Sequence, residues 1–158
     1  MKPNKMAIGI IGIAMLAIVL GSTIQPALAA KVMAVGIFAD KSRYSVQETV
    51  RLTVAAKYDT SGLVGFAACI RYKIIIKEVK WLGLYKKEIV QRTYEGSCYV
   101  GRLPNPINIQ QTLDIHASRF GNGNHKIYAE VWFASAMVFG VVTSWEKGTS
   151  RTIEITVR

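Results

Sequence analysis

The chain has 158 residues, with 20 lysine and arginine residues against 10 acidic ones, and 51% of it is hydrophobic. That length is enough for a hydrophobic core, which excludes the class of very small proteins that need a metal ion to fold. The formal net charge of +10 favours anionic neighbours, such as surface polymers or lipid headgroups, but carries no information on the fold.

The first 29 residues differ in kind from the rest. Lys2 and Lys5 precede the uncharged apolar run Met6–Leu20, and a short tail ends in Ala27-Leu28-Ala29. This order of charged, apolar and small residues is typical of a secretory signal peptide that is cleaved after Ala29. As a helix, the apolar run would span about 22 Å, which is short of the roughly 30 Å hydrocarbon core of a bilayer. We therefore expect a hydrophobic leader helix over residues 1–29.

Two other interpretations of the leader stay open. Left uncleaved, Met6–Ala29 is long enough to act as a membrane anchor. A type IV pilin or archaellin stem would also keep the apolar helix, although those families usually carry Gly or Ala where this chain has Asn4-Lys5. Each interpretation places residues 30–158, predicted as a single domain, outside the cytoplasmic membrane. The domain would be either secreted or held at the outer face of that membrane on the cell surface.

The first predicted strand of the domain, Val32–Ala39, is apolar on both faces. Such a strand is expected under a loop or at a corner of the fold, or else as a donor strand that completes the sheet of a neighbouring subunit. Head-to-tail donation does not close on itself and would build a filament. The two expected faces are Val32, Ala34 and Phe38 against Met33, Val35 and Ile37. The assembly candidates in this strand are Val32, Val35, Ile37 and Phe38.

The next two predicted strands, Thr49–Tyr58 and Val64–Val79, alternate apolar and polar residues with period two. In the second strand, Tyr72, Ile74 and Ile76 share the apolar face. This pattern indicates antiparallel sheet with one face in the core and one face in water.

Basic and aromatic residues gather on the polar face of the strand 64–79 and in the segment Trp81–Lys87, which is predicted as a turn before the strand Glu88–Glu95. Such a cluster could hold an anionic glycan or a lipid headgroup. It could equally be a solvated face whose lysines deter edge-to-edge aggregation. Nucleic acid is disfavoured, because export separates the domain from most of it. The candidates for an anionic-ligand face are Arg71, Lys73, Lys77, Lys80, Trp81, Lys86 and Lys87, with Tyr85 beside them.

The two cysteines, Cys69 and Cys98, both lie in the predicted domain. An even pair in an exported domain favours a disulfide over a metal or catalytic site. Closing that loop would stabilise the fold by roughly 3 to 4 kcal/mol on the chain-entropy argument.

Four further strands are predicted, at Ile107–His116, Lys126–Phe133, Ala136–Val142 and Thr152–Arg158. The third of them carries no charge over seven residues, so it is either a core strand or the wall of an acceptor groove or a membrane-facing tip. The assembly candidates in this strand are Val138 and Phe139. Seven to nine short strands with frequent turns predict an all-β, antiparallel, two-sheet sandwich.

Three patches resemble prokaryotic Ig-like surface domains of the cell-adhesion-related type. Tyr44–Leu52 resembles the opening of their second strand, Gly123–Val131 their penultimate strand, and Gly148–Val157 their closing strand. The family often has Gly where this chain has Gln47. The resemblance implies an adhesive or structural module on the cell surface, with no catalytic residue.

Catalytic residues are not indicated. Of the two histidines, His116 falls on a polar strand face and His125 beside a turn, so both are predicted to be solvated. Asp114 and Glu130, the carboxylates that an exported hydrolase would need, are expected to face solvent singly. No cofactor or metal ion is expected.

The sequence therefore predicts a non-enzymatic, exported or cell-surface β-sandwich with a structural or adhesive role, which assembles with itself through its N-terminal strand or contacts other surface proteins. A binding module for anionic glycan or lipid headgroups, and a type IV pilin or archaellin-like filament subunit, remain as alternatives.

Overall fold

The computed structural model describes residues 31–61, 67–80, 83–100, 103–138 and 141–158. The predicted leader, residues 1–29, lies outside these ranges, as do Trp81 and Phe139. The described chain forms nine strands and one short 3-10 helix, η2. Their bounds are β1 Lys31–Ala39, β2 Arg43–Tyr44, β3 Thr49–Asp59, β4 Ala67–Lys80, β5 Tyr85–Val100, β6 Ile107–His116, η2 Ala117–Arg119, β7 Gly123–Val138, β8 Val141–Thr149 and β9 Ile153–Val157.

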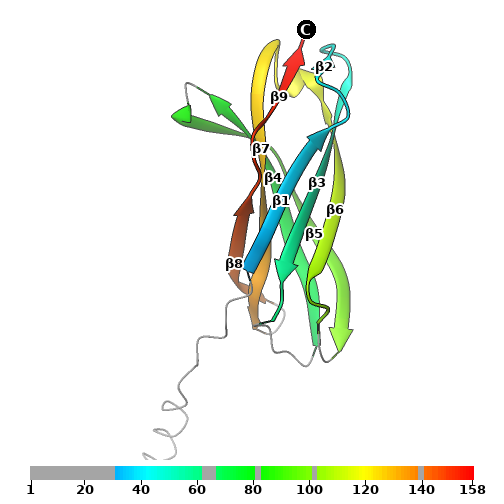
Figure 1. The fold of residues 1–158 in the computed structure, drawn as a ribbon, viewed down its shortest axis with the longest axis vertical. Helices are drawn as coiled ribbons and strands as arrows, with labels where there is room; N and C mark the ends of the chain where they lie inside the picture. The colour runs from blue at the N-terminus through cyan, green and yellow to red at the C-terminus, as the bar shows by residue number, and fades with distance from the viewer. Residues whose placement is uncertain (1–30, 62–66, 81–82, 101–102, 139–140) are drawn as a thin grey trace, which may run out of the picture.

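The strands form two sheets, which confirms the prediction of an all-β, two-sheet protein. One sheet has the order β1-β3-β6, and the other has the order β2-β9-β7-β4-β5, with β8 paired to β7. All pairings are antiparallel except the short one between β2 and β9, which is parallel. In Figure 1 the two sheets lie face to face along the long axis of the molecule.

The longest strands make the frame of the second sheet. β7 pairs with β4 along one edge, and its other edge is shared by two strands in succession. Residues Gly123–Ile127 pair with β9, and residues Glu130–Val138 pair with β8. β8 and β9 therefore run in the same direction, one after the other, along the same side of β7.

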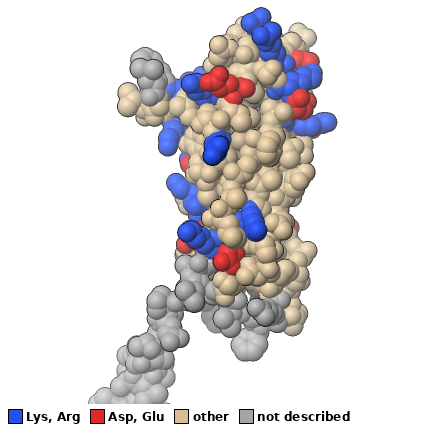
Figure 2. Space-filling model, viewed as in Figure 1, with Lys and Arg blue, Asp and Glu red and all other residues tan. Residues whose placement is uncertain are grey.

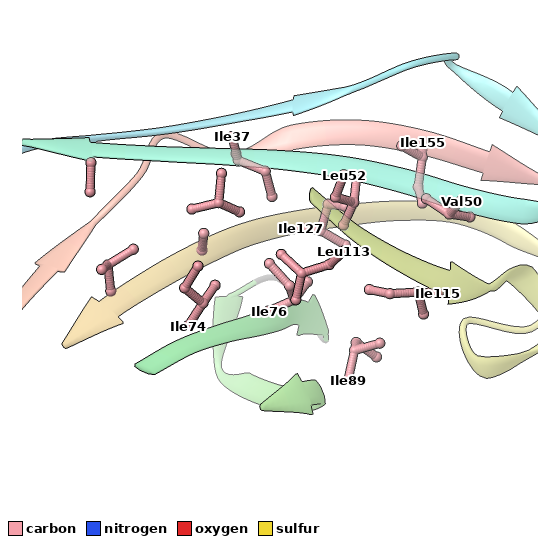
Figure 3. Close-up of a cluster of buried hydrophobic side chains, with 14 of the residues drawn as sticks. Ile37, Val50, Leu52, Ile74, Ile76, Ile89, Leu113, Ile115, Ile127 and Ile155 are labelled. Carbon is pink, nitrogen blue, oxygen red and sulfur yellow. The ribbon is translucent and has the colours of Figure 1, made fainter. Parts of the chain in front are cut away.

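The core lies between the sheets and follows from the alternation seen in the sequence. Val50 and Leu52 of β3 point inward against Ile74 and Ile76 of β4 (Figure 3). These four side chains and that of Val54 are fully buried. Burying a side chain of this size stabilises the fold by about 1.5 to 3 kcal/mol relative to leaving it exposed. The two sheets are thus held together mainly by aliphatic contact.

Strand β1 departs from the predicted arrangement of its faces. Its register against β3 shifts between Val32 and Ala34, so the strand has a β-bulge there. Because of this extra residue, Val32 packs against the core together with Val35, whereas the sequence placed the two valines on opposite faces. The strand is not covered on both faces either, because the side chain of Phe38 is 62% exposed.

The turn predicted over Trp81–Lys87 is shorter than expected. β5 begins at Tyr85, because Tyr85 and Lys86 pair with Lys80 and Val79 of β4. The resulting β4–β5 hairpin leaves the body of the sandwich, and its end projects clear of the other strands at the upper left of Figure 1.

Candidate functional site: a lysine and tryptophan face on the second sheet

The outer face of the second sheet collects aromatic and basic side chains from three strands. Alternation along β4 turns Ile74 and Ile76 inward, so Lys73 and Lys77 point outward. The register of β4 against β7 places Lys73 directly opposite Trp132. We define the lysine–tryptophan face by Lys73 and Lys77 of β4, Glu130 and Trp132 of β7, and Trp145 and Lys147 of β8.

Its central feature is an alternating stack of cations and rings. The Nζ atom of Lys73 lies 5.0 Å from the ring centroid of Trp132 and 4.6 Å from that of Trp145. The Nζ atom of Lys147 lies 5.4 Å from the Trp132 ring. Distances within about 6 Å allow cation–π attraction of about 0.5 to 1 kcal/mol each at exposed sites. The tryptophans therefore hold two ammonium groups in place at the sheet surface.

Glu130 organises the neighbouring part of the face. Its Oε2 atom accepts hydrogen bonds from Lys77 Nζ at 2.9 Å and from Trp132 Nε1 at 3.2 Å, so it fixes the ring that the lysines contact. Burial tends to raise the pKa of the Glu130 carboxyl, but the hydrogen bonds from Lys77 and Trp132 outweigh that effect and hold this pKa below its usual value. The prediction that Glu130 faces open solvent is wrong, since it is only 4% exposed.

Lys73 and Lys147 differ from Lys77 in having no carboxylate partner within the described part of the chain. Lys77 is neutralised by Glu130, and that contact raises the pKa of Lys77. The face thus presents two cations that aromatic rings hold in position and that form no ion pair with an acidic group of the described residues, although the charge of Lys147 helps to lower the pKa of Glu130. Such an arrangement can bind an anion without first breaking an internal ion pair.

The structure divides the predicted basic cluster into separate groups. Lys73, Lys77 and Lys86 lie on the outer face, where Lys86 sits 5.6 Å from the ring of Tyr128. Lys80 and Lys87 point the other way. Lys80 contacts the buried carboxylate of Glu78, Lys87 donates a hydrogen bond to the carbonyl oxygen of Arg119 at 3.4 Å, and Trp81 lies outside the described residues.

Sequence reasoning missed three members of the face, Trp132, Trp145 and Lys147. All three lie more than fifty residues beyond Lys73 in the sequence, and only the pairing of β4 with β7, and of β7 with β8, brings them to it. The available signal was that the tryptophan in β7 alternates with the buried residues Val131 and Phe133. It pointed to an outward ring but not to its partners.

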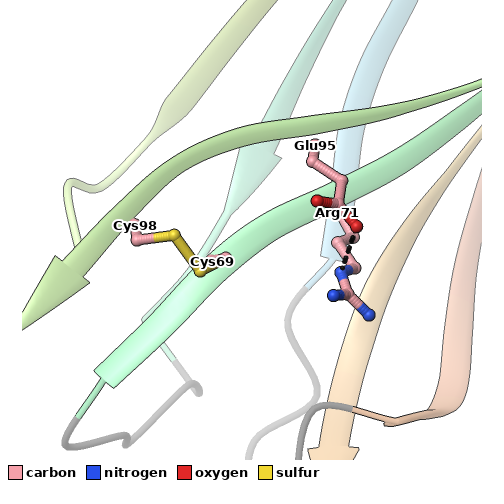
Figure 4. Close-up of a disulfide and its surroundings, with 4 residues drawn as sticks. All are labelled: Cys69, Arg71, Glu95 and Cys98. Atoms are coloured by element: carbon pink, nitrogen blue, oxygen red, sulfur yellow. Dashed lines mark ion pairs between the residues drawn. A yellow bond between two sulfur atoms is a disulfide. The ribbon is translucent and has the colours of Figure 1, made fainter.

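The predicted disulfide between Cys69 and Cys98 is present and joins directly opposite residues of β4 and β5 (Figure 4). Two residues further along β4, Arg71 forms an ion pair with Glu95 of β5 at 3.0 Å. Arg71 is therefore engaged at the edge of the sheet beside the disulfide. Disulfides of this kind persist in oxidising, extracellular environments.

The assembly candidates of β1 divide between the core and the surface. Ile37 is buried, and Val32 and Val35 are partly buried against the core. Phe38 instead lies on the outer face of the first sheet, where it lines a shallow groove of about 370 Å³ together with Ala34 and Gly36. Figure 2 shows few charged side chains over the middle of this view. Of the other assembly candidates, the side chain of Val138 and the whole of Phe139 lie outside what the structure describes.

One histidine contradicts the prediction that both are solvated. His116 is exposed, but His125 is only 3% exposed and its Nδ1 atom lies 2.6 Å from Oε1 of Glu78. Its Nε2 atom lies 2.9 Å from the carbonyl oxygen of Gly121. This buried pair sits at the root of the β4–β5 hairpin and joins β4 to β7.

Within the described ranges, no group of three or more histidine, cysteine, aspartate or glutamate side chains is placed to hold a metal ion. The described part of the chain also contains no helix with the length and apolar character needed to cross a membrane.

Comparison with known proteins gives only distant likenesses. No family model matches the chain, and neither does any curated protein. Among solved structures, the sporulation control protein Spo0M from Bacillus subtilis is similar, with 14% identity, a TM-score of 0.38, and coverage of 82% of this chain and 49% of that one.

Two further solved structures show a similar degree of likeness. A β-glucosidase from Listeria innocua, in complex with glucose, has 10% identity over 78% of this chain and 16% of its own, with a TM-score of 0.35. The alkylpurine DNA glycosylase AlkC from Pseudomonas fluorescens has 12% identity over 78% of this chain and 30% of its own, with a TM-score of 0.32. The chain spans half or less of the length of each of the three. Likeness at these TM-scores carries no argument about function.

Proposed function

We propose that this protein is an exported, cell-surface, Ig-like β-sandwich that acts as a non-enzymatic adhesive module and binds an anionic polymer through the lysine–tryptophan face. The observation that carries the proposal is the pair of ammonium groups, Lys73 and Lys147, held against Trp132 and Trp145 without a carboxylate partner in the described chain. Ring contact limits the motion of both lysines, so binding an anion costs less side-chain entropy.

The strand order supports the Ig-like part of the proposal. In an Ig-like sandwich the first, second and fifth main strands share one sheet, and the third, sixth and seventh share the other. Leaving out the two-residue β2, and counting β8 and β9 as one interrupted strand, this chain divides these six strands in the same way. Its fourth strand, β5, pairs with the third, whereas the constant-type Ig fold has the fourth strand in the sheet of the first. Its disulfide differs, because it joins neighbouring strands of one sheet where antibody domains link the two sheets.

A surface location is supported by the disulfide and by the leader expected from the sequence. N-terminal sequencing of the protein isolated from cells tests the leader directly. A start at Ala30 supports cleavage by signal peptidase, a start near Met6 supports a pilin-like stem, and an intact Met1 supports an anchor.

Binding is tested with polygalacturonate as the anionic polymer and dextran as the neutral one. Lys73→Gln combined with Lys147→Gln is expected to weaken polygalacturonate binding by about ten-fold or more, because two charge-assisted contacts are lost. Lys57→Gln is the matched control, since Lys57 is exposed on the outer face of the other sheet. Equal binding by the double variant and the control, or equal binding of dextran, would contradict the proposal.

Self-assembly through the first sheet is the second candidate, and the exposed ring of Phe38 above the groove favours it. Deleting β1 would not test it, because the deletion also removes the buried Ile37 from the core. Phe38→Ser changes only the outer face. If this face joins subunits, the variant reduces the mass measured by light scattering, whereas Val46→Ser, on a partly exposed residue of the turn before β3, leaves that mass unchanged.

A further inference from the structure

The projecting end of the β4–β5 hairpin is a surface that the proposed polymer-binding face does not use. Leu84 is 90% exposed and Tyr85 is 59% exposed. They lie where β5 begins, and the start of β5 belongs to the part of the hairpin that projects from the sandwich (Figure 1). Scattered exposed apolar residues are ordinary, but two adjacent ones at the end of a projecting element form a specific contact surface. Leaving these two apolar side chains in water is unfavourable, so the surface favours an apolar partner.

Cations lie directly behind this apolar end. Lys86 and Lys87 follow it on β5, and each is directed back towards the root of the hairpin, because Lys86 lies over the ring of Tyr128 and Lys87 reaches the carbonyl oxygen of Arg119. Lys80 is not counted with them, because it forms an ion pair with the buried Glu78. The surface therefore has two levels, with apolar side chains at the end and ammonium groups one level behind.

The spacing of these two levels fits a lipid surface. Lys86 and Lys87 follow Leu84 by two and three residues, which at about 3.3 Å per strand residue places the lysines about 7 to 10 Å behind it. Interfacial protein segments bury their apolar side about 5 to 10 Å into the boundary between headgroups and acyl chains. A tyrosine is suited to that boundary, and lysines behind it would meet anionic headgroups.

We propose that the residues at which β5 begins insert into the interface of an anionic lipid bilayer, with Leu84 and Tyr85 among the upper acyl chains and Lys86 and Lys87 at the level of the phosphates. An anionic polymer would satisfy the lysines but would leave Leu84 in water. A protein groove would satisfy Leu84 without requiring two cations behind it. An anionic bilayer offers acyl chains to the apolar side chains and phosphates to the lysines at the same time.

The direct test measures how deeply the start of β5 lies in the bilayer. It uses the protein as isolated from cells, whether or not a leader is retained. Leu84→Trp places a fluorescent reporter at the hairpin end, and Thr112→Trp places one on the exposed face of β6 as the matched control. The native tryptophans contribute the same background to both variants. The vesicles contain phosphatidylglycerol and phosphatidylcholine, with bromine on the acyl chains as the quencher.

We expect the added emission of Leu84→Trp to be quenched by brominated vesicles and that of Thr112→Trp to be unaffected. Quenching should persist with excess polygalacturonate and fall in pure phosphatidylcholine. Equal quenching of the two reporters, or none at position 84, would overturn the proposal. Quenching at position 84 that is lost when polygalacturonate is added would assign the hairpin to the polymer instead.

A charge variant tests the second level. Lys86→Glu combined with Lys87→Glu is expected to weaken association with phosphatidylglycerol vesicles by about twenty-five-fold, from about five-fold for each lysine removed. Leu84→Asp is expected to abolish quenching by bromine near the headgroup end of the chains, measured with a reporter at Tyr85→Trp. If the lysine variant binds vesicles like the parent, or if Lys57→Glu weakens binding equally, the hairpin is not the lipid contact.

Discussion

Gly148 of β8 shows how closely β1 is packed against the second sheet. A Cβ atom at this position would lie 2.2 Å from Cγ1 of Val32 and 2.7 Å from Cγ2 of Val35. Both neighbours are β-branched and have little rotamer freedom with which to move aside. The glycine is therefore required by close approach and not by an unusual backbone angle.

Gly148→Ala is predicted to lower the free energy of unfolding by about 1 to 3 kcal/mol, as overpacking of a well-filled site does. Urea unfolding followed by circular dichroism measures the change. Adding Val32→Ala in the same chain should recover part of the loss, because it removes the nearest atom. A double variant that is less stable than the sum of the two single variants would contradict this account.

The carboxylate of Glu130 links stability to pH. Its pKa is below the usual value of 4.5, so its contribution to stability is present above the unfolded-state pKa and is lost as the pH falls through the folded-state pKa. Glu130→Gln removes that contribution. The variant should be less stable than the parent at pH 7, and the gap should narrow as the pH is lowered from about 5 towards 2. Unfolding midpoints measured across this range test the prediction, and a constant gap would refute it.

At the scale of elements, the disulfide crosslinks the start of β4 to the end of β5. It closes a loop with a sequence separation of 29 residues, and a loop of that length corresponds to about 3 to 4 kcal/mol on the chain-entropy argument. Replacing Cys69 and Cys98 by serine together should lower the free energy of unfolding by up to that amount. Hydrogen exchange should quicken first near these residues, while the central part of β7 stays protected. Uniform quickening through the whole sheet would show that the crosslink has no local role.

Most of the strands could be predicted from the sequence, because they have one buried face and one face in water. The prediction of one strand over Ala136–Val142 is wrong, because β7 ends at Val138 and β8 begins at Val141. Thr49–Tyr58 and Ile107–His116 were placed almost to the residue, since alternation fixes both the period and the face. Val32 was placed on the wrong face, because a bulge adds one residue without leaving a signature in composition. His125 was misplaced for a different reason: nothing near it in the sequence announces the buried carboxylate of Glu78, 47 residues earlier.

The candidate site was only half predictable for a related reason. Lys73 and Lys77 were found, because they alternate with core residues of their own strand. Their ring partners were not found, because the pairing of β4 with β7 depends on the packing of the whole sandwich and not on local sequence. For this face, the sequence predicts which residues point outward but not which residues of neighbouring strands lie opposite them.

At the scale of the whole molecule, β9 ties together segments from the two ends of the described chain. It pairs with β7 on one side and with β2 on the other, and Ile155 is 1% exposed in the core. Ile155→Ala is predicted to cost about 2 to 5 kcal/mol, the range for emptying a filled core position. The loss should appear as one cooperative unfolding transition. If β2 alone becomes labile to protease while the sandwich keeps its melting temperature, the coupling is weaker than the pairing indicates.

The pairing of β2 with β9 also affects the order in which the strands can form. Arg43 and Tyr44 find their neighbours only when Thr156 and Val157 have arrived, more than a hundred residues later. Loop closure over such a span is slow, and sheets built from distant segments form late. Strand β1 can pair early, because its partner β3 follows closely in the chain. The β2–β9 connection cannot, so in the exported protein that we propose it would close only after the last strand has left the membrane.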